Sequence, residues 1–149
     1  MPPAPWKVVS CKWDKFYRVF SLRTDRVCSP RTGEEHDFFI LESPPWVNVI
    51  PLTDAGEVVL IRQYSHGLRE VTLEIPGGLI EPGDTPEAAA RRELREETGC
   101  TARALVDLGY VHPNPAIQNN RCFTFLALGV TLAGAQELDE KEDIEVLFR

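Results

Sequence analysis

Three glutamates near the middle of the chain are spaced to act together. Glu93, Glu96 and Glu97 lie three and four positions apart, so a helix places them on one face. Adjacent carboxylates repel one another unless a cation or a basic group lies among them. Hard divalent ions such as Mg²⁺ prefer oxygen ligands of this kind. The spacing therefore predicts a metal site.

The residues around these glutamates predict a helix from about residue 85 to residue 98. Asp84 or Thr85 can act as the N-cap with Pro86 just inside, and Gly99 is suited to end the helix. Between these ends, alanine, leucine and arginine are good helix formers. The preceding stretch, 77–83, is rich in glycine and is broken by proline, so it is expected to be a loop. A loop followed by an acidic helix can form a catalytic unit.

This segment resembles the signature of the Nudix hydrolases: a glycine, a glutamate six positions later, and then Arg-Glu-aliphatic-any-Glu-Glu-any-Gly-aliphatic. The matching positions are Gly78, Arg92, Glu93, Leu94, Glu96, Glu97 and Gly99. Two positions depart from the pattern, because Asp84 stands where the glutamate is expected and Cys100 takes the final aliphatic place. Neither is expected to bind metal. The shorter carboxylate of Asp84 instead affects how that residue ties down the loop.

The resemblance implies hydrolysis of a nucleoside diphosphate linked to another group, with Mg²⁺ or Mn²⁺ as the cofactor. It implies Glu93, Glu96 and Glu97 as helix ligands, the Gly77 carbonyl as a further ligand, and Arg92 as the residue that orients the carboxylates. A bound metal ion lowers the pKa of an attacking water and stabilises charge on the leaving oxygen. The ordinary interpretation of an acidic helix face is a solvated surface. Because the matching signature positions all fall in register, we favour a metal site over a solvated surface.

Other stretches are similar to the branch of ADP-ribose pyrophosphatases and their nucleotide-sugar relatives: 62–64, 73–78, 112–115 and 138–146. In that branch an acidic loop supplies a metal ligand and a general base. When segment 138–146 is aligned with that branch, the resemblance implies Glu140 as the general base and Glu142 as the metal ligand. The acids close enough to compete for these roles are Glu137, Asp139 and Asp143.

The catalytic residues implied by the resemblance are thus Glu140, Glu97 and Arg92. Glu74 is expected to pair with Arg92 or with the substrate, two roles that the sequence leaves open. The expected substrate-binding residues are Arg62, Glu74, Trp46, Arg69 and Tyr17. Each of these arginines and aromatic residues is, taken alone, more often a surface or packing residue.

Bulk properties fit one small enzyme domain. The chain has 149 residues, 43% of them hydrophobic, which is enough for one core. A formal charge of −7 argues against nonspecific nucleic-acid binding. The four cysteines show no close pair, and the start lacks a secretory signal, so we expect a cytoplasmic protein. No apolar run approaches the roughly eighteen residues of a membrane span.

The rest of the chain is expected to consist of strands separated by turns, giving an α+β fold of the Nudix sandwich type. It would hold a mixed β-sheet with the catalytic loop and helix, and a small N-terminal antiparallel sheet. We expect two hairpins, 17–22 with 26–29 and 47–52 with 58–63. Further strands are expected at 37–42, 72–75, 102–110, 122–130 and 144–148.

The expected organisation is a flexible tail at 1–6, an N-terminal sheet at 7–43 and the Nudix domain at 44–149. In the branch that the chain resembles, the N-terminal sheet docks between two subunits, so a homodimer is implied. Relatives usually continue past the last strand, so the end at Arg149 indicates a short or truncated member.

The favoured function is hydrolysis of ADP-ribose or a related nucleoside diphosphate sugar to a nucleoside monophosphate and a sugar phosphate. One alternative is a module that binds or senses a nucleotide sugar without turnover. The other is a housecleaning pyrophosphohydrolase of nucleoside triphosphates. The intact helix glutamates favour an enzyme.

Overall fold

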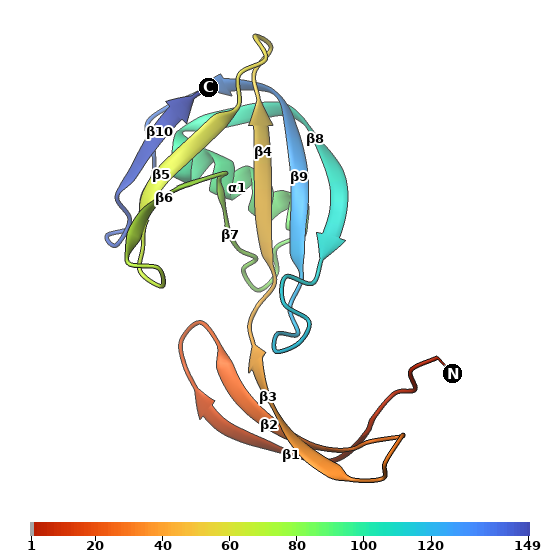
Figure 1. The fold of residues 1–149 in the computed structure, drawn as a ribbon. Helices are drawn as coiled ribbons and strands as arrows, with labels where there is room; N and C mark the ends of the chain where they lie inside the picture. The colour runs from red at the N-terminus through yellow and green to blue at the C-terminus, as the bar shows by residue number, and fades with distance from the viewer. Residues whose placement is uncertain (1) are drawn as a thin grey trace. The chain divides into compact units, whose positions relative to one another are not determined.

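The computed structural model describes residues 2–149 and holds, within them, ten strands and one α-helix. Their contacts divide the chain into two compact units. The first unit holds the residues up to Pro44 together with His112–Arg121, and the second holds Pro45–Val111 together with Cys122–Arg149. The α+β class predicted from sequence is confirmed, with a mixed sheet and a separate antiparallel sheet (Figure 1).

The first unit contains a three-stranded antiparallel sheet in the order β1-β2-β3 (Figure 1). Its strands are β1 Lys7–Phe16, β2 Ser21–Cys28 and β3 Glu35–Glu42. The hairpin predicted at 17–22 with 26–29 is wrong, because β2 runs unbroken through the expected turn. Thr24, in the middle of that turn, pairs with Lys12 of β1 and Phe39 of β3. Pairing with β1 and β3 on its two sides therefore keeps this polar part of β2 in an extended conformation.

The second unit consists of two sheets and the helix α1 (Pro86–Thr98) (Figure 1). One sheet has the order β7-β4-β9-β8, and in it β4 and β9 are parallel. The other has the order β10-β5-β6 and is antiparallel. The strands are β4 Trp46–Leu52, β5 Val59–Ser65, β6 Glu70–Glu74, β7 Gly77–Leu79, β8 Cys100–Val111, β9 Cys122–Leu132 and β10 Ile144–Phe148.

The predicted hairpin of 47–52 with 58–63 is also wrong. A single bridge joins Leu52 to Val58, after which β4 and β5 enter different sheets. Val49 of β4 and Val59 of β5 nevertheless lie in the same core, where Leu94 of α1 is 1% exposed. Because both sheets bury apolar residues with this one helix, the two strands diverge instead of pairing.

Helix α1 confirms its prediction closely. The hydroxyl of Thr85 accepts the N–H of Ala88 at 3.1 Å, as an N-cap does. Gly99 ends the helix in the left-handed conformation, with φ of 70°. Within residues 2–149, no helix is both long and apolar enough to cross a membrane.

The segment expected to be a loop begins instead with the short strand β7, which pairs with β4. A Cβ at Gly77 would collide with the backbone carbonyl of Val47. The absence of a side chain at Gly77 therefore allows the backbones of β7 and β4 to approach closely. This places Gly77 directly beside the helix glutamates.

Candidate active site

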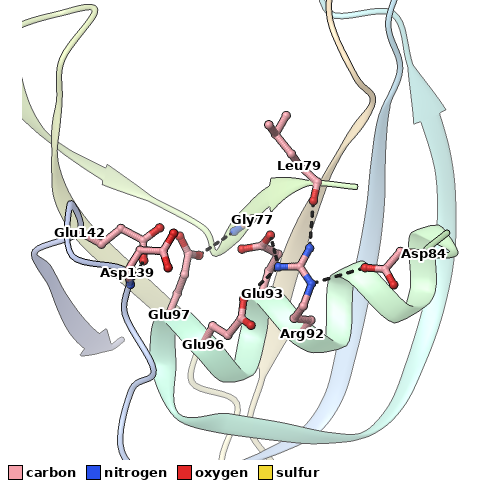
Figure 2. Close-up of polar contacts among 9 residues, drawn as sticks. All are labelled: Gly77, Leu79, Asp84, Arg92, Glu93, Glu96, Glu97, Asp139 and Glu142. Atoms are coloured by element: carbon pink, nitrogen blue, oxygen red, sulfur yellow. Dashed lines mark hydrogen bonds and ion pairs between the residues drawn. The ribbon is translucent and has the colours of Figure 1, made fainter. Parts of the chain in front are cut away.

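The guanidinium of Arg92 lies among the carboxylates of α1 (Figure 2). Its Nη1 donates to Glu93 Oε1 and to Glu96 Oε2, each at 2.9 Å. Burial lowers the pKa of Arg92, but the hydrogen bond to Glu96 and the charge of Glu93 outweigh it and raise that pKa above its usual value. Arg92 therefore neutralises two neighbouring carboxylates.

The same side chain connects the helix to the preceding segment. Arg92 Nη2 donates to the Leu79 carbonyl at 3.0 Å, and Nε approaches Asp84 Oδ2 at 3.5 Å (Figure 2). The backbone N–H of Asp84 donates to the Glu81 carbonyl at 3.0 Å, whereas its side chain, the departure from the signature, makes only this long contact with Arg92. The shorter carboxylate leaves that connection weak.

Glu97 is the most enclosed of the helix carboxylates, with 5% of the residue exposed. Its Oε2 accepts the backbone N–H of Gly77 at 2.9 Å. Burial raises the pKa of Glu97 to about 8. The hydrogen bond from Gly77 lowers this pKa, whereas the negative charges of Glu93 and Glu142 raise it further. Burial likewise raises the pKa of Glu93, against the effect of Arg92. The charged forms of both carboxylates are therefore disfavoured in the absence of a cation.

The acidic segment before β10 brings Glu142 to this end of the helix. Figure 2 shows the Glu142 side chain facing Glu97, beside Asp139. The Asp139 N–H donates to Glu142 Oε2 at 2.9 Å, which holds the carboxylate in place. Glu140 is exposed in the turn of the same segment. Of the two acids singled out by register, Glu142 is thus the one whose charge acts on Glu93 and Glu97.

Glu74 does not pair with Arg92, so that one of its two expected roles is wrong. Its carboxylate accepts from Gln63 Nε2 at 3.1 Å, from Ser65 Oγ at 2.9 Å, and from the Thr72 hydroxyl. Burial opposes ionisation, but the hydrogen bonds from these three side chains hold the pKa of Glu74 below its usual value. An ionised carboxylate therefore stands close enough to Glu97 to raise its pKa.

The other expected substrate residues are spread along the chain. Arg62 Nη1 pairs with Glu145 of β10 at 2.9 Å. Arg69 lies in the turn after β5 with φ of 59°. Trp46 begins β4 in the second unit, whereas Tyr17 belongs to the first unit and stacks on Phe20 with ring centroids 4.7 Å apart. Within the second unit, Arg62 on β5 and Trp46 on β4 lie in different sheets.

The donor set at α1 suits a hard divalent cation, because Glu93, Glu97 and Glu142 repel one another electrostatically and Glu96 adds to the negative charge at Glu93. As arranged, however, no three His, Cys, Asp or Glu side chains within residues 2–149 form a ready metal-binding group. Arg92 lies where a cation would neutralise Glu93 and Glu96. Each of these carboxylates bonds Arg92 through one oxygen, so its second oxygen remains for an ion.

Sequence reasoning missed two groups near the site. The side chains around Glu74, at 63, 65 and 72, alternate along β5 and β6, and this polar alternation is a signal that could have identified them. Gln136 contacts the end of α1 through its side chain. A single glutamine in a polar segment gives no such signal.

Fold and site together define an α+β domain built around one acidic loop-and-helix segment. The family profile described as NUDIX domain matches residues 43–148. The chain belongs to the Nudix family.

Several proteins are similar to it. ADP-ribose pyrophosphatase of Bacillus subtilis (strain 168) is 37% identical over 131 residues, covering 87% of this chain and 70% of that protein. Methanol dehydrogenase activator of Bacillus methanolicus is 31% identical over the same shares. ADP-sugar pyrophosphatase of Mus musculus is 39% identical over 83% of this chain and 57% of that protein. A crystal structure of ADP compounds hydrolase shares the fold, with a TM-score of 0.85 and 22% identity over 99% of this chain and 80% of that chain.

Proposed function

We propose that this chain hydrolyses the diphosphate of ADP-ribose or of a related nucleoside diphosphate sugar. Water adds to one phosphorus atom and the bridging oxygen leaves with the other, giving a nucleoside monophosphate and a sugar phosphate. Relatives named for ADP-ribose and ADP-sugar hydrolysis support this substrate class. The observation that carries the proposal is the buried carboxylate of Glu97, held on Gly77 beside Glu93 and Glu142.

Mg²⁺ or Mn²⁺ is the proposed cofactor, and Nudix hydrolases in general need divalent metal ions. Glu93, Glu96, Glu97 and Glu142 would hold it, with the Gly77 carbonyl as a further oxygen donor. When bound, the ion would neutralise the substrate phosphates and lower the pKa of the attacking water.

The chain's own residues supply the remaining chemistry. The Gly77 N–H fixes the orientation of Glu97, and Asp139 fixes that of Glu142. Arg92 holds Glu93 and Glu96 in register on the helix face. Glu140, exposed in the turn next to Glu142, can take the proton of the attacking water as general base.

The remaining proposals concern substrate contacts and assembly. Arg62, Arg69 and Glu74 are proposed to contact the phosphates or the sugar, and Trp46 and Tyr17 the base. A homodimer is proposed by analogy with the branch that the sequence resembles. All four cysteines are free, which supports work in the reducing cytoplasm.

The test is product release from a panel of ADP-ribose, ADP-glucose, UDP-glucose, GDP-mannose and nucleoside triphosphates. Each compound is assayed with Mg²⁺, with Mn²⁺ and with a chelator. We expect metal-dependent cleavage of a diphosphate sugar. Cleavage of triphosphates alone would instead indicate the housecleaning activity. No cleavage, with a thermal shift on adding a nucleotide sugar, would indicate a binding module.

A further inference from the structure

One glutamine joins the end of α1 to the start of β10. The side-chain amide of Gln136 donates to the Glu97 carbonyl at 2.6 Å and to the Ile144 carbonyl at 3.1 Å. Glu97 lies in the last turn of the helix, and Ile144 is the first residue of the strand. The half-buried amide of Gln136 thus bonds two backbone carbonyls from separate elements. We refer to this pair of hydrogen bonds as the Gln136 bridge.

The Gln136 bridge belongs to the cap on the C-terminal end of α1. The last four carbonyls of a helix have no partner inside the helix. Here the Glu96 carbonyl accepts the N–H of Glu137 at 2.8 Å, and the neighbouring Glu97 carbonyl accepts the Gln136 amide. The segment that leads into the acidic loop is thereby docked on the helix end.

The second bond of the bridge closes the acidic loop. Gln136 and Ile144 flank segment 137–143, which carries Glu142. Inside this segment, the N–H of Glu142 donates to the Asp139 carbonyl at 3.0 Å. Because the Glu142 side chain faces Glu97 (Figure 2), its distance from Glu97 depends on where the base of the loop is fixed.

We infer that Gln136 is a positioning residue that fixes the acidic loop on the C-terminal end of α1 and so sets the separation of the Glu142 and Glu97 carboxylates. The inference rests on the proposed function only where it gives that separation a role in metal binding and turnover. It depends on the amide itself. A glutamate at 136 would present oxygen to two carbonyl oxygens, and a methionine would present no donor.

The experiment uses the full chain and two variants of similar shape, Gln136→Glu and Gln136→Met. Arg95→Gln is the matched control, since it breaks the Arg95–Glu137 ion pair at the same junction, whose side chains are 60% and 54% exposed. Such an exposed pair contributes little. Metal-free amide exchange is followed by mass spectrometry, and Mn²⁺ affinity by electron paramagnetic resonance.

In both Gln136 variants, we expect amides of segment 137–143 to exchange about tenfold faster, while β8 and β9 keep their protection. We expect Mn²⁺ affinity to fall several-fold and kcat on the best substrate to fall more than KM rises. The Arg95→Gln control should match the wild type. If the two variants unfold, Gln136→Asn, with an amide one methylene shorter, should show the same changes at smaller size.

Wild-type exchange in segment 137–143 together with wild-type Mn²⁺ affinity in a folded Gln136 variant would overturn the inference. Equal loosening in Arg95→Gln would also overturn it, because the effect would then belong to the whole junction. If the loop loosens as expected but the wild type neither binds Mn²⁺ nor cleaves any diphosphate, the Gln136 bridge stands and the proposed function fails.

Discussion

At the scale of single residues, neighbouring carboxylates of α1 have different partners. Glu93 and Glu96 share the guanidinium of Arg92, whereas Glu97 is bonded to a backbone N–H and is surrounded by like charge. An ionised group that is buried without a counter-charge costs free energy unless a cation is supplied. Glu97 is therefore the carboxylate expected to gain most from a metal ion.

Glu97→Gln should lower turnover by two or more orders of magnitude at saturating Mg²⁺ while the fold remains intact, because a neutral amide is a poor ligand. The glutamine oxygen can still accept the Gly77 N–H. Steady-state kinetics and circular dichroism check this. Glu87→Gln is the control, since Glu87 is on the same helix and pairs only with Arg91 in the contacts described. Near-normal turnover in Glu97→Gln would remove Glu97 from the site.

The roles of Glu140 and Glu142 can be distinguished by measuring the Mn²⁺ affinity of variants at each position. Glu142→Gln should weaken Mn²⁺ binding about tenfold or more, because it removes a carboxylate beside Glu97. Glu140→Gln should reduce turnover with little change in Mn²⁺ affinity. Mn²⁺ titration and turnover are measured on both variants. The reverse pattern would exchange the two roles.

Glu74 should contribute stability that depends on pH. Its pKa is lower in the folded protein than the usual value, so ionised Glu74 stabilises the fold above the unfolded-state pKa of about 4.3, and this stability is lost as pH falls through the folded pKa. The stability gap between wild type and Glu74→Gln should thus be widest near neutral pH and narrow in acid. Urea midpoints measured at several pH values between neutral and acid check this. A gap that widens in acid contradicts it.

At the scale of elements, α1 positions the site and is stabilised by its own ends. Thr85→Ala removes the acceptor of the Ala88 N–H and should cost about 1 kcal/mol. For a domain of this size, that lowers Tm by roughly 2–4 °C. Calorimetry measures the change, and Thr85→Ser, which keeps the hydroxyl, should restore most of the stability. An unchanged Tm in Thr85→Ala would show that the cap contributes nothing.

Elements with local signals could be predicted from sequence, and those defined by tertiary contacts could not. Helix α1 carries its caps and its good helix formers within a few residues, and β9 and β10 are apolar runs that match their predicted ranges closely. Strand β1 was missed because every residue in it is exposed, so its sequence shows no buried face. The divergence of β4 and β5 depends on a shared core that no local pattern records.

Some residues of the site could likewise be predicted from the sequence, and others could not. The helix carboxylates and Arg92 follow from a motif with fixed spacing. In the acidic run, register with the resembling branch indicates Glu142 as the ligand, but several acids within a few positions compete for the role, and only the fold shows which one faces Glu97. The partners of Glu74 and the Gln136 bridge join segments far apart in sequence, so only the folded chain brings them together.

At the scale of the whole molecule, the first unit presents large apolar side chains to solvent. Phe16 is 72% exposed and Phe39 is 62% exposed. Covering such surface favours association. If the proposed homodimer forms through this unit, Phe39→Glu should shift sedimentation from dimer to monomer. Leu132→Glu, at a residue 67% exposed in the second unit, should leave the dimer intact. A wild-type monomer, or equal dissociation in both variants, would contradict this.

Arg92 also bears on the order in which the protein is assembled. A helix with several acids on one stripe would resist forming if it depended on a metal ion for charge balance. Arg92 is part of the same helix and already neutralises Glu93 and Glu96, so two of the three carboxylates on this face have a counter-ion from synthesis. Folding and metal loading can therefore be separate events. If the proposed metal ion is required for turnover, the metal-free chain would be folded but inactive and would gain activity when the ion is added.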